Sequence, residues 1–149
     1  MDTGARGDPL APGDRGAGLE RLILDTTVLV SAERGRRRLE RAIGDDDDVA
    51  IAAVTAAELL VGVELAGPER RAARGAFVED LLETLTVEDY TLATARVHAH
   101  LLAATRSAGS PRGAHDLIIA ATAAASGRVV VTIDARGFQG LPGVDVRLV

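Results

Sequence analysis

The chain has 149 residues, which is enough for one domain with a hydrophobic core and too few for two domains of ordinary size. It contains no cysteine, so disulfides, thiolate zinc sites and cysteine nucleophiles are excluded. All 17 basic residues are arginine and the net charge is −5, so a polyanion such as a nucleic acid would need local arginine clusters or metal ions to bind.

Residues 1–20 are rich in glycine, proline and aspartate and lack hydrophobic periodicity. This composition predicts a disordered N-terminal tail ahead of a folded domain over residues 21–149. No run in the chain approaches the roughly 18 consecutive apolar residues that span a membrane. No apolar segment precedes Leu22, which argues against a secretory signal. We therefore expect a cytoplasmic protein that does not contact a membrane.

The first part of the predicted domain alternates strands and helices. Residues 21–25 (RLILD) form a short apolar strand, and residues 26–35 and 36–44 are predicted to be helical, each ending near a glycine. The acidic run at 45–48 is predicted to be a solvated loop. Residues 49–54 (VAIAAV) are apolar throughout, which is typical of a strand buried on both faces.

Two helices and a short strand are predicted next. The first helix covers residues 55–67 and has hydrophobic residues at helical spacing; the second covers residues 68–85 and begins with a proline. Residues 86–90 are predicted to form a brief edge strand. An amphipathic helix over residues 91–109 follows, ending at a glycine.

The last part of the chain holds the most apolar helix and two further strands. After a turn at 110–113, the helix over residues 114–127 is apolar all round, which predicts a central position. Residues 128–132 (RVVVT) form a strong strand, residues 133–143 a loop, and residues 144–149 a final strand.

These strands are separated by helices and are too apolar to have a face in water. This pattern indicates a parallel sheet with helices on both sides. The sequence therefore predicts an α/β fold, a three-layer α/β/α domain with a central, mainly parallel sheet of about four to five strands. In such folds ligands bind at the carboxyl ends of the strands.

Four acidic residues are predicted to meet at that edge of the sheet. Asp25, Glu58 and Asp134 each follow a predicted strand, and Asp116 opens the apolar helix. Each has a purely structural alternative. Asp25 suits a helix cap, Thr55 and Glu58 match a capping box, Asp134 suits a turn, and Asp116 complements a helix dipole.

A shared metal ion accounts for all four acids at once. Burying the charge of Asp25 inside an apolar run is costly unless something compensates it. Four carboxylates that converge in a cleft of low dielectric repel one another strongly. A hard divalent cation removes that repulsion, and a set of oxygen ligands suits Mg²⁺ or Mn²⁺. His115, which adjoins Asp116, is a candidate for contact with substrate, but a supporting or surface role is favoured.

Four segments carry a resemblance to a known family. LDTTVLVSA, TAAELLVG, HDLIIAATA and VVVTIDARGF resemble, in this order, the motifs of the PIN domain, in particular those of VapC-type toxins of bacterial toxin–antitoxin pairs. The resemblance runs from Leu22 to the C-terminus and excludes the tail. Thr27 departs from the serine or asparagine that family members often carry, but it keeps a hydroxyl.

The resemblance implies a metal-dependent endoribonuclease that cleaves RNA and so inhibits growth. It also implies a tight homodimer and a cognate VapB-type antitoxin that blocks the cleft. One or two Mg²⁺ or Mn²⁺ ions would lower the pKa of a bound water and stabilise charge on the phosphate. Thr132, with Thr26 or Thr27, would hydrogen-bond the attacking water or a metal ligand. The implied metal ligands are Asp25, Glu58, Asp116 and Asp134.

With no lysine in the chain, arginines must bind the RNA backbone. Arg112 and Arg136 lie nearest to the acids in the sequence. The densest group of arginines is Arg34, Arg36, Arg37, Arg38 and Arg41. For residues 36–38, a solvated helix end is as good an interpretation as RNA contact.

Two alternatives share the predicted fold. One is a PIN-like nuclease outside a toxin–antitoxin system, and the other is an inert interaction module, which the intact set of four acids disfavours. Receiver-type phosphoacceptors and haloacid-dehalogenase-like phosphatases also place an aspartate after the first strand. Both depend on a lysine late in the chain, which is absent here.

Overall fold

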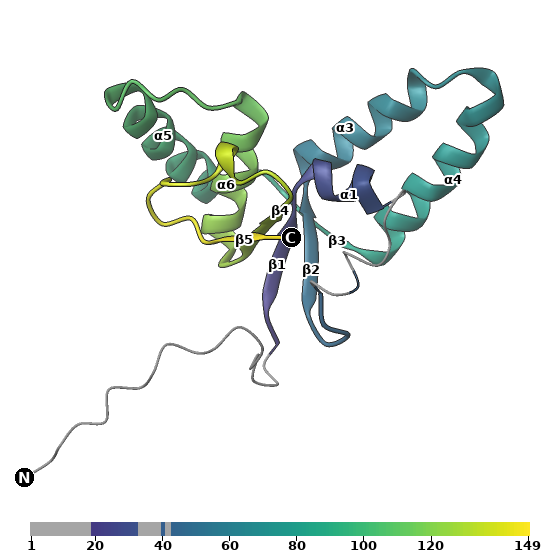
Figure 1. Ribbon diagram of the computed structural model, residues 1–149, viewed down its shortest axis with the longest axis horizontal. Coiled ribbons are helices and arrows are strands. Elements are labelled where there is room, and N and C mark those ends of the chain that lie inside the picture. Colours follow the sequence, from purple (N-terminus) through teal and green to yellow (C-terminus); the bar gives the residue numbers. More distant parts are fainter. Residues whose placement is uncertain (1–18, 33–39, 41–42) are drawn as a thin grey trace, which may run out of the picture.

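The computed structural model describes residues 19–32, 40 and 43–149. Over these residues the chain folds into one parallel sheet with helices on both sides (Figure 1). Most of the predicted tail lies outside the described residues, as do Arg34, Arg36, Arg37, Arg38 and Arg41 and most of the helix predicted at 36–44.

The sheet has five strands in the order β3-β2-β1-β4-β5, and every neighbouring pair is parallel. The predicted fold class is therefore confirmed. The chain moves outward from β1 to β2 and β3 and then returns to place β4 and β5 on the other side of β1. In open parallel sheets, the crevice at such a reversal is where ligands bind. The strands are β1 (Arg21–Leu24), β2 (Asp48–Ala52), β3 (Thr86–Glu88), β4 (Val129–Thr132) and β5 (Val146–Leu148).

The helices follow the predicted order. They are α1 (Thr26–Ala32), α3 (Ala53–Glu64), α4 (Pro68–Thr84), α5 (Leu92–Ser107) and α6 (Ala114–Ser126), with a 3-10 turn, η1 (Ala135–Gly137), after β4. Both ends of β2 were predicted wrongly. Strand β2 ends at Ala52 and α3 begins at once with Ala53, so Val54 and Thr55 lie inside the first turn of the helix. Asp48, predicted to be in a loop, opens β2.

Alternate residues of the strands build two separate hydrophobic cores. Leu22, Leu24 and Val131 pack with α1, α3 and α4, whereas Ile23 and Val130 face α5 and α6. Figure 1 shows α3 and α4 on one side of the sheet and α5 and α6 on the other. Because side chains of a strand point alternately to opposite faces, the wholly apolar strands of this sheet need cover on both sides.

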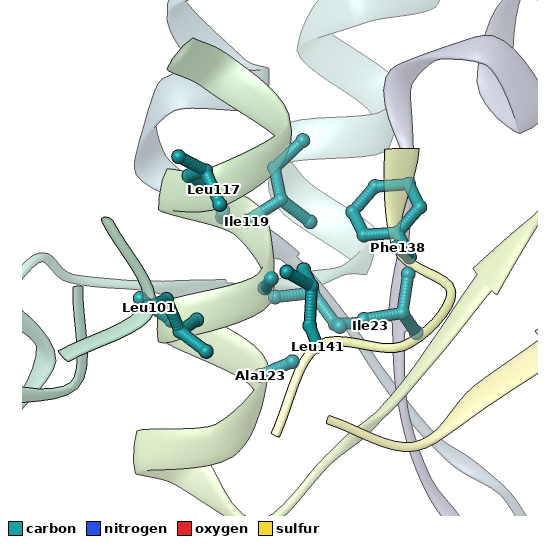
Figure 2. Packing of buried hydrophobic residues seen from close by; sticks show 11 residues of the cluster. Ile23, Leu101, Leu117, Ile119, Ala123, Phe138 and Leu141 are labelled. Atoms are coloured by element: carbon teal, nitrogen blue, oxygen red, sulfur yellow. The ribbon is translucent and has the colours of Figure 1, made fainter. Parts of the chain in front are cut away.

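The loop after β4 is anchored to the second of these cores. Phe138 is 1% exposed and Leu141 is 5% exposed, and both pack with Ile23 of β1 and with Leu117 and Ile119 of α6. Figure 2 shows these side chains gathered beside α6. The same loop carries Asp134 and Arg136, two of the residues predicted for the site.

The opposite edge of the sheet holds a buried arginine. Nε of Arg128 donates to Oε1 of Glu88 at 2.9 Å, and Nη1 lies 3.1 Å from Oδ1 of Asp48 and donates to the main-chain oxygens of Leu22 and Asp48. The arginine side chain is 2% exposed. These contacts tie β4 to β1, β2 and β3. None of the described helices is long and apolar enough to cross a membrane.

Candidate metal centre

Asp25 lies at the reversal point between the central strands β1 and β4. Its side chain is buried, and its Oδ2 accepts hydrogen bonds from the hydroxyls of Thr27 at 2.7 Å and Thr132 at 2.9 Å. In the first turn of α1, the N–H of Val28 donates to the main-chain oxygen of Asp25 rather than to its carboxylate. The carboxylate is therefore held by two hydroxyls at the binding edge of the sheet, and the helix-cap interpretation has no contact to support it.

Asp134 lies next to this pair. Its main-chain N–H donates to the Thr132 hydroxyl at 3.1 Å, so Thr132 links the loop after β4 to Asp25. Both carboxylate oxygens of Asp134 accept from the guanidinium of Arg136, at distances from 2.7 to 3.2 Å. Side-chain and main-chain hydrogen bonds from Arg136 lower the pKa of Asp134 from 3.8 to about 2. The carboxylate is thus negatively charged and already paired.

Asp116 lies in the first turn of α6, and its pKa is affected by the other three acids. Its pKa is raised above 3.8, first by burial and then by the negative charges of Asp25, Glu58 and Asp134; His115 partly offsets this effect. Elements distant in sequence therefore place three other carboxylates near enough to oppose its ionisation.

Main chain packs closely against the Asp116 carboxylate. An added methyl group at Gly137 would lie 2.6 Å from Oδ2 of Asp116, and one at Gly113 would lie 3.0 Å from the same oxygen. Neither position leaves room for a larger residue without displacing the acid. The loop after β4 and the start of α6 thus form a cradle around this side chain.

Glu58 lies in the second turn of α3, and the structure contradicts the alternative in which it forms a capping box with Thr55. The N-cap residue is Ala52, with no side-chain cap, and Thr55 is a buried residue inside the helix. The Thr55 hydroxyl instead accepts from that of Thr26 at 3.4 Å, which joins α3 to α1. The alanines before Thr55 let the helix start earlier, because alanine favours helix over strand.

One carboxylate oxygen of Glu58 lacks a hydrogen bond. Oε1 is buried and has no donor in the part of the chain that the structure describes. Nδ1 of His115 lies 2.8 Å away, close enough for an ion pair when the imidazole is protonated but out of line for a hydrogen bond. A buried carboxylate oxygen without a donor is costly unless a cation satisfies it.

The residues present suit a divalent cation in their chemistry. The four acids offer only oxygen ligands, and one of these oxygens, Oε1 of Glu58, accepts no hydrogen bond from the residues that the structure describes. The charges of the other three acids raise the pKa of Asp116. Within residues 19–32, 40 and 43–149, however, no three His, Cys, Asp or Glu side chains lie close enough together to enclose an ion. Asp134 is instead turned toward the Arg136 guanidinium, and Oε1 of Glu58 lies against the imidazole of His115.

The two arginines predicted to bind RNA have different surroundings. Arg112 donates to the main-chain oxygens of Arg136 at 2.8 Å and Gln139 at 2.7 Å, so its guanidinium holds the loop after β4. Arg136 has an 89% exposed side chain at the rim of the site. Of the two, only Arg136 presents its charge to solvent beside the acids.

Sequence reasoning missed the two glycines and the loop-holding contacts of Arg112. Gly137 and Gly113 each stand three residues from a predicted acid, but a glycine in a loop does not reveal which side chain it must admit. Glu58 and His115 are 57 residues apart and lie on different helices, so no local sequence pattern predicts their contact.

An apolar pocket of about 170 Å³ adjoins the acids between α1, α3 and α4. Glu58 and Thr26 form its border with the acidic site. The pocket is lined by Thr26, Leu29, Val30, Glu58, Leu59, Gly62, Arg74, Phe77 and Val78.

Known proteins share both sequence and fold with this chain. Ribonuclease VapC5 of Mycobacterium tuberculosis is 40% identical over 115 residues, which cover 75% of this chain and 82% of that protein. Ribonuclease VapC of Rickettsia bellii is 28% identical over 128 residues, covering 84% and 93%. The solved structure of VapBC-5 from Mycobacterium tuberculosis, described as a member of the VapBC family of toxin–antitoxin systems, is 31% identical with a TM-score of 0.72, covering 87% of this chain and 98% of that one.

The family of this chain is established by how much of the sequence matches a family model. The sequence matches the PIN domain over residues 22–143, a range that contains all four acids, the whole of β4 and all of β1 except Arg21. The strand order places the end of β1, which Asp25 follows, beside the end of β4, which precedes Asp134. The chain belongs to the PIN domain family.

Proposed function

We propose that this protein is a VapC-type toxin, an endoribonuclease that depends on Mg²⁺ or Mn²⁺ and is neutralised by a cognate VapB-type antitoxin. The match to the PIN domain over residues 22–143, a range that includes Asp25, Glu58, Asp116 and Asp134, carries the proposal, and the raised pKa of Asp116, to which the charges of the other three acids contribute, supports it. The relatives named Ribonuclease VapC support the reaction class.

Each acid has a distinct place in the proposed site. Asp25, Asp116, Glu58 and Asp134 would hold the cation, with Oε1 of Glu58 contributing the orphaned oxygen. When bound, the cation supplies charge neutralisation for the phosphate and a more acidic water molecule. Thr132 fixes the orientation of Asp25 through its hydroxyl and of Asp134 through that residue's main-chain N–H.

The protein has few means of attracting RNA over a distance, because its net charge is −5. Arg136, exposed beside Asp134, is proposed to contact an RNA phosphate. Arg112, whose donors are directed to main-chain oxygens, is proposed to act on RNA through the loop that it holds.

Protein partners are proposed on the side of α1 and α3. Large apolar side chains are exposed there, which is typical of surfaces that meet other proteins. They are Val30, Leu60, Val61 and Leu65, with exposed fractions from 40% to 81%. The VapBC-5 structure supports an antitoxin as one partner, and the family resemblance supports a homodimer. We place this assembly in the cytoplasm, where its RNA substrate would be.

A nuclease assay tests the proposed reaction. Purified protein with Mn²⁺ should cleave RNA, and EDTA should abolish cleavage. Glu58→Gln should slow cleavage at least about 100-fold, which corresponds to about 2.7 kcal/mol in the barrier. The matched control is Glu64→Gln, an exposed glutamate at the end of the same helix, which should cleave at the wild-type rate.

Two results would contradict the proposal in different ways. Cleavage by Glu58→Gln at the wild-type rate would remove Glu58 from the site. No metal-dependent cleavage by the wild-type protein would favour the inert module with the same fold. Arrest of growth on expression, relieved by the product of the adjacent gene, separates a toxin from a PIN-like nuclease outside such a system.

A further inference from the structure

The carboxylate of Asp134 is fully occupied by a single residue. Oδ1 accepts from the main-chain N–H of Arg136 at 3.1 Å and from its Nε at 2.9 Å, and Oδ2 accepts from Nη2 at 2.7 Å. A forked contact of this kind directs both oxygens toward the arginine. In this arrangement, a metal ion would have to compete with the Arg136 guanidinium for either carboxylate oxygen of Asp134.

The ion pair between Arg136 and Asp134 is exposed enough to be replaced by another cation. The side chain of Arg136 is 89% exposed and that of Asp134 is 45% exposed, so water can take over each hydrogen bond as it breaks. Exposed ion pairs are weakly held because solvent screens them. A buried pair such as that of Arg128 would resist exchange, whereas this one would not.

The main chain beneath Arg136 is fixed independently of its side chain. Arg112 holds the main-chain oxygens of Arg136 and Gln139, and Phe138 is buried in the core. The guanidinium of Arg136 can therefore swing away from Asp134 while the loop stays in place. Exchange requires only side-chain rotations, which are fast in exposed residues.

The remaining acids favour such an exchange. The carboxylate of Asp25 accepts from two hydroxyls and Oε1 of Glu58 accepts from no donor among the described residues, so Arg136 beside Asp134 leaves the repulsion between these acids in place. One monovalent guanidinium at the rim neutralises only its own partner. A divalent cation among the four acids would relieve more of this repulsion.

We propose that Arg136 is a displaceable counter-ion of the site, which pairs with Asp134 until a divalent cation takes that carboxylate over. Metal binding then frees the Arg136 guanidinium at the rim, where a phosphate can accept from it. The inference rests on the proposed function, since it requires the acids to bind a metal.

The affinity for Mn²⁺ tests this inference without any measurement of activity. Arg136→Gln should bind Mn²⁺ more tightly than the wild-type protein in calorimetric titration. If the ion pair is formed about 80% of the time, the dissociation constant should fall about fivefold. The matched control is Arg96→Gln, an exposed arginine on α5, which should leave the dissociation constant unchanged.

The same substitution in a protein that lacks the Asp134 charge separates the Arg136–Asp134 ion pair from general repulsion between Arg136 and the metal ion. In Asp134→Asn, which lacks the carboxylate charge, Arg136→Gln should no longer tighten Mn²⁺ binding. An equal gain in both backgrounds would overturn the inference, since Arg136 would then act only through its distant positive charge. Equal affinities of wild-type protein and Arg136→Gln would overturn it as well. By contrast, a wild-type protein that binds no Mn²⁺ would refute the metal site of the proposed function itself.

Discussion

Thr132 donates its hydroxyl proton to Oδ2 of Asp25 at 2.9 Å, joining the ends of two neighbouring strands 107 residues apart in the sequence. Both side chains are buried, with exposed fractions of 0% and 5%. The same hydroxyl accepts from the main-chain N–H of Asp134. Thr132 therefore contacts both the carboxylate of Asp25 and the main chain of Asp134, and we propose it as a positioning residue of the site.

Thr132→Val tests this positioning because it removes the hydroxyl and preserves the shape. Hydrogen bonds to charged groups contribute about 1.5–3 kcal/mol, so the free energy of unfolding should fall by about that amount. RNA cleavage should fall as well, since Asp25 loses one of its two donors. Thr132→Ser, which restores the hydroxyl, should recover cleavage; failure of this rescue would show that the methyl group rather than the hydrogen bond matters.

Asp116 should destabilise the protein at neutral pH when no metal is bound. Its pKa is raised in the folded state, so between 3.8 and that higher pKa the folded chain binds more protons than the unfolded chain. Stability contributed by this group is therefore present at low pH and is lost as pH rises through the folded pKa. Asp116→Asn in EDTA should be more stable than wild type at about pH 7, with the difference shrinking toward about pH 4.

Urea unfolding at both pH values checks this expectation. Asp89→Asn, an exposed acid in the loop after β3, is the matched control and should show no comparable gain. A wild-type protein more stable than Asp116→Asn at neutral pH in EDTA would mean that neither burial nor the neighbouring acids disfavour the charge of Asp116.

Gly137→Ala should damage the site through sterics alone. Its new methyl group would lie 2.6 Å from Oδ2 of Asp116, closer than carbon and oxygen approach without displacement. We expect Mn²⁺ affinity to fall by about tenfold or more, which is about 1.4 kcal/mol in binding free energy. Gly62→Ala is the control, because nothing lies within 4 Å of its added methyl group; it should keep Mn²⁺ binding. Unchanged binding by Gly137→Ala would exclude Asp116 from the metal ligands.

Arg128→Met should unfold the protein more easily without touching the site. It leaves the carboxylates of Asp48 and Glu88 without their buried partner, and loss of one member of a buried ion pair costs about 3 kcal/mol or more. Arg21→Gln, which removes the exposed partner of Asp48, should cost less than about 1 kcal/mol. Similar losses for both variants in denaturant unfolding would contradict the central place given to Arg128.

Local patterns predicted the elements of this fold, and tertiary contacts decided the details of its site. Wholly apolar strands such as VVVT indicated a sheet covered on both sides, and the chain order of strands and helices indicated parallel pairing. The start of α3 was misplaced because AAV before Thr55 suits a buried strand as well as a helix. Only the folded chain reveals that Thr55 faces Thr26 instead of capping a helix.

The four acids could be predicted from the sequence because each lies next to a recognisable strand or helix. The side chains that pair with them could not be predicted. Arg136 stands two residues from Asp134, yet its sequence position could not distinguish a phosphate contact from the ion pair that it forms. Arg112 likewise stands close to Asp116 in the chain but donates to a loop more than 20 residues away. Such choices depend on side-chain direction, which sequence spacing does not encode.

The stabilisation of the protein by Mn²⁺ tests most directly whether the four acids share a cation. A ligand that binds only the folded state stabilises it by about 2.7 kcal/mol at a concentration 100 times its dissociation constant. The melting temperature of the wild-type protein should therefore rise with Mn²⁺, whereas that of Asp25→Asn/Asp116→Asn should respond far less. Equal rises in melting temperature for the two proteins would contradict a shared metal site at Asp25 and Asp116.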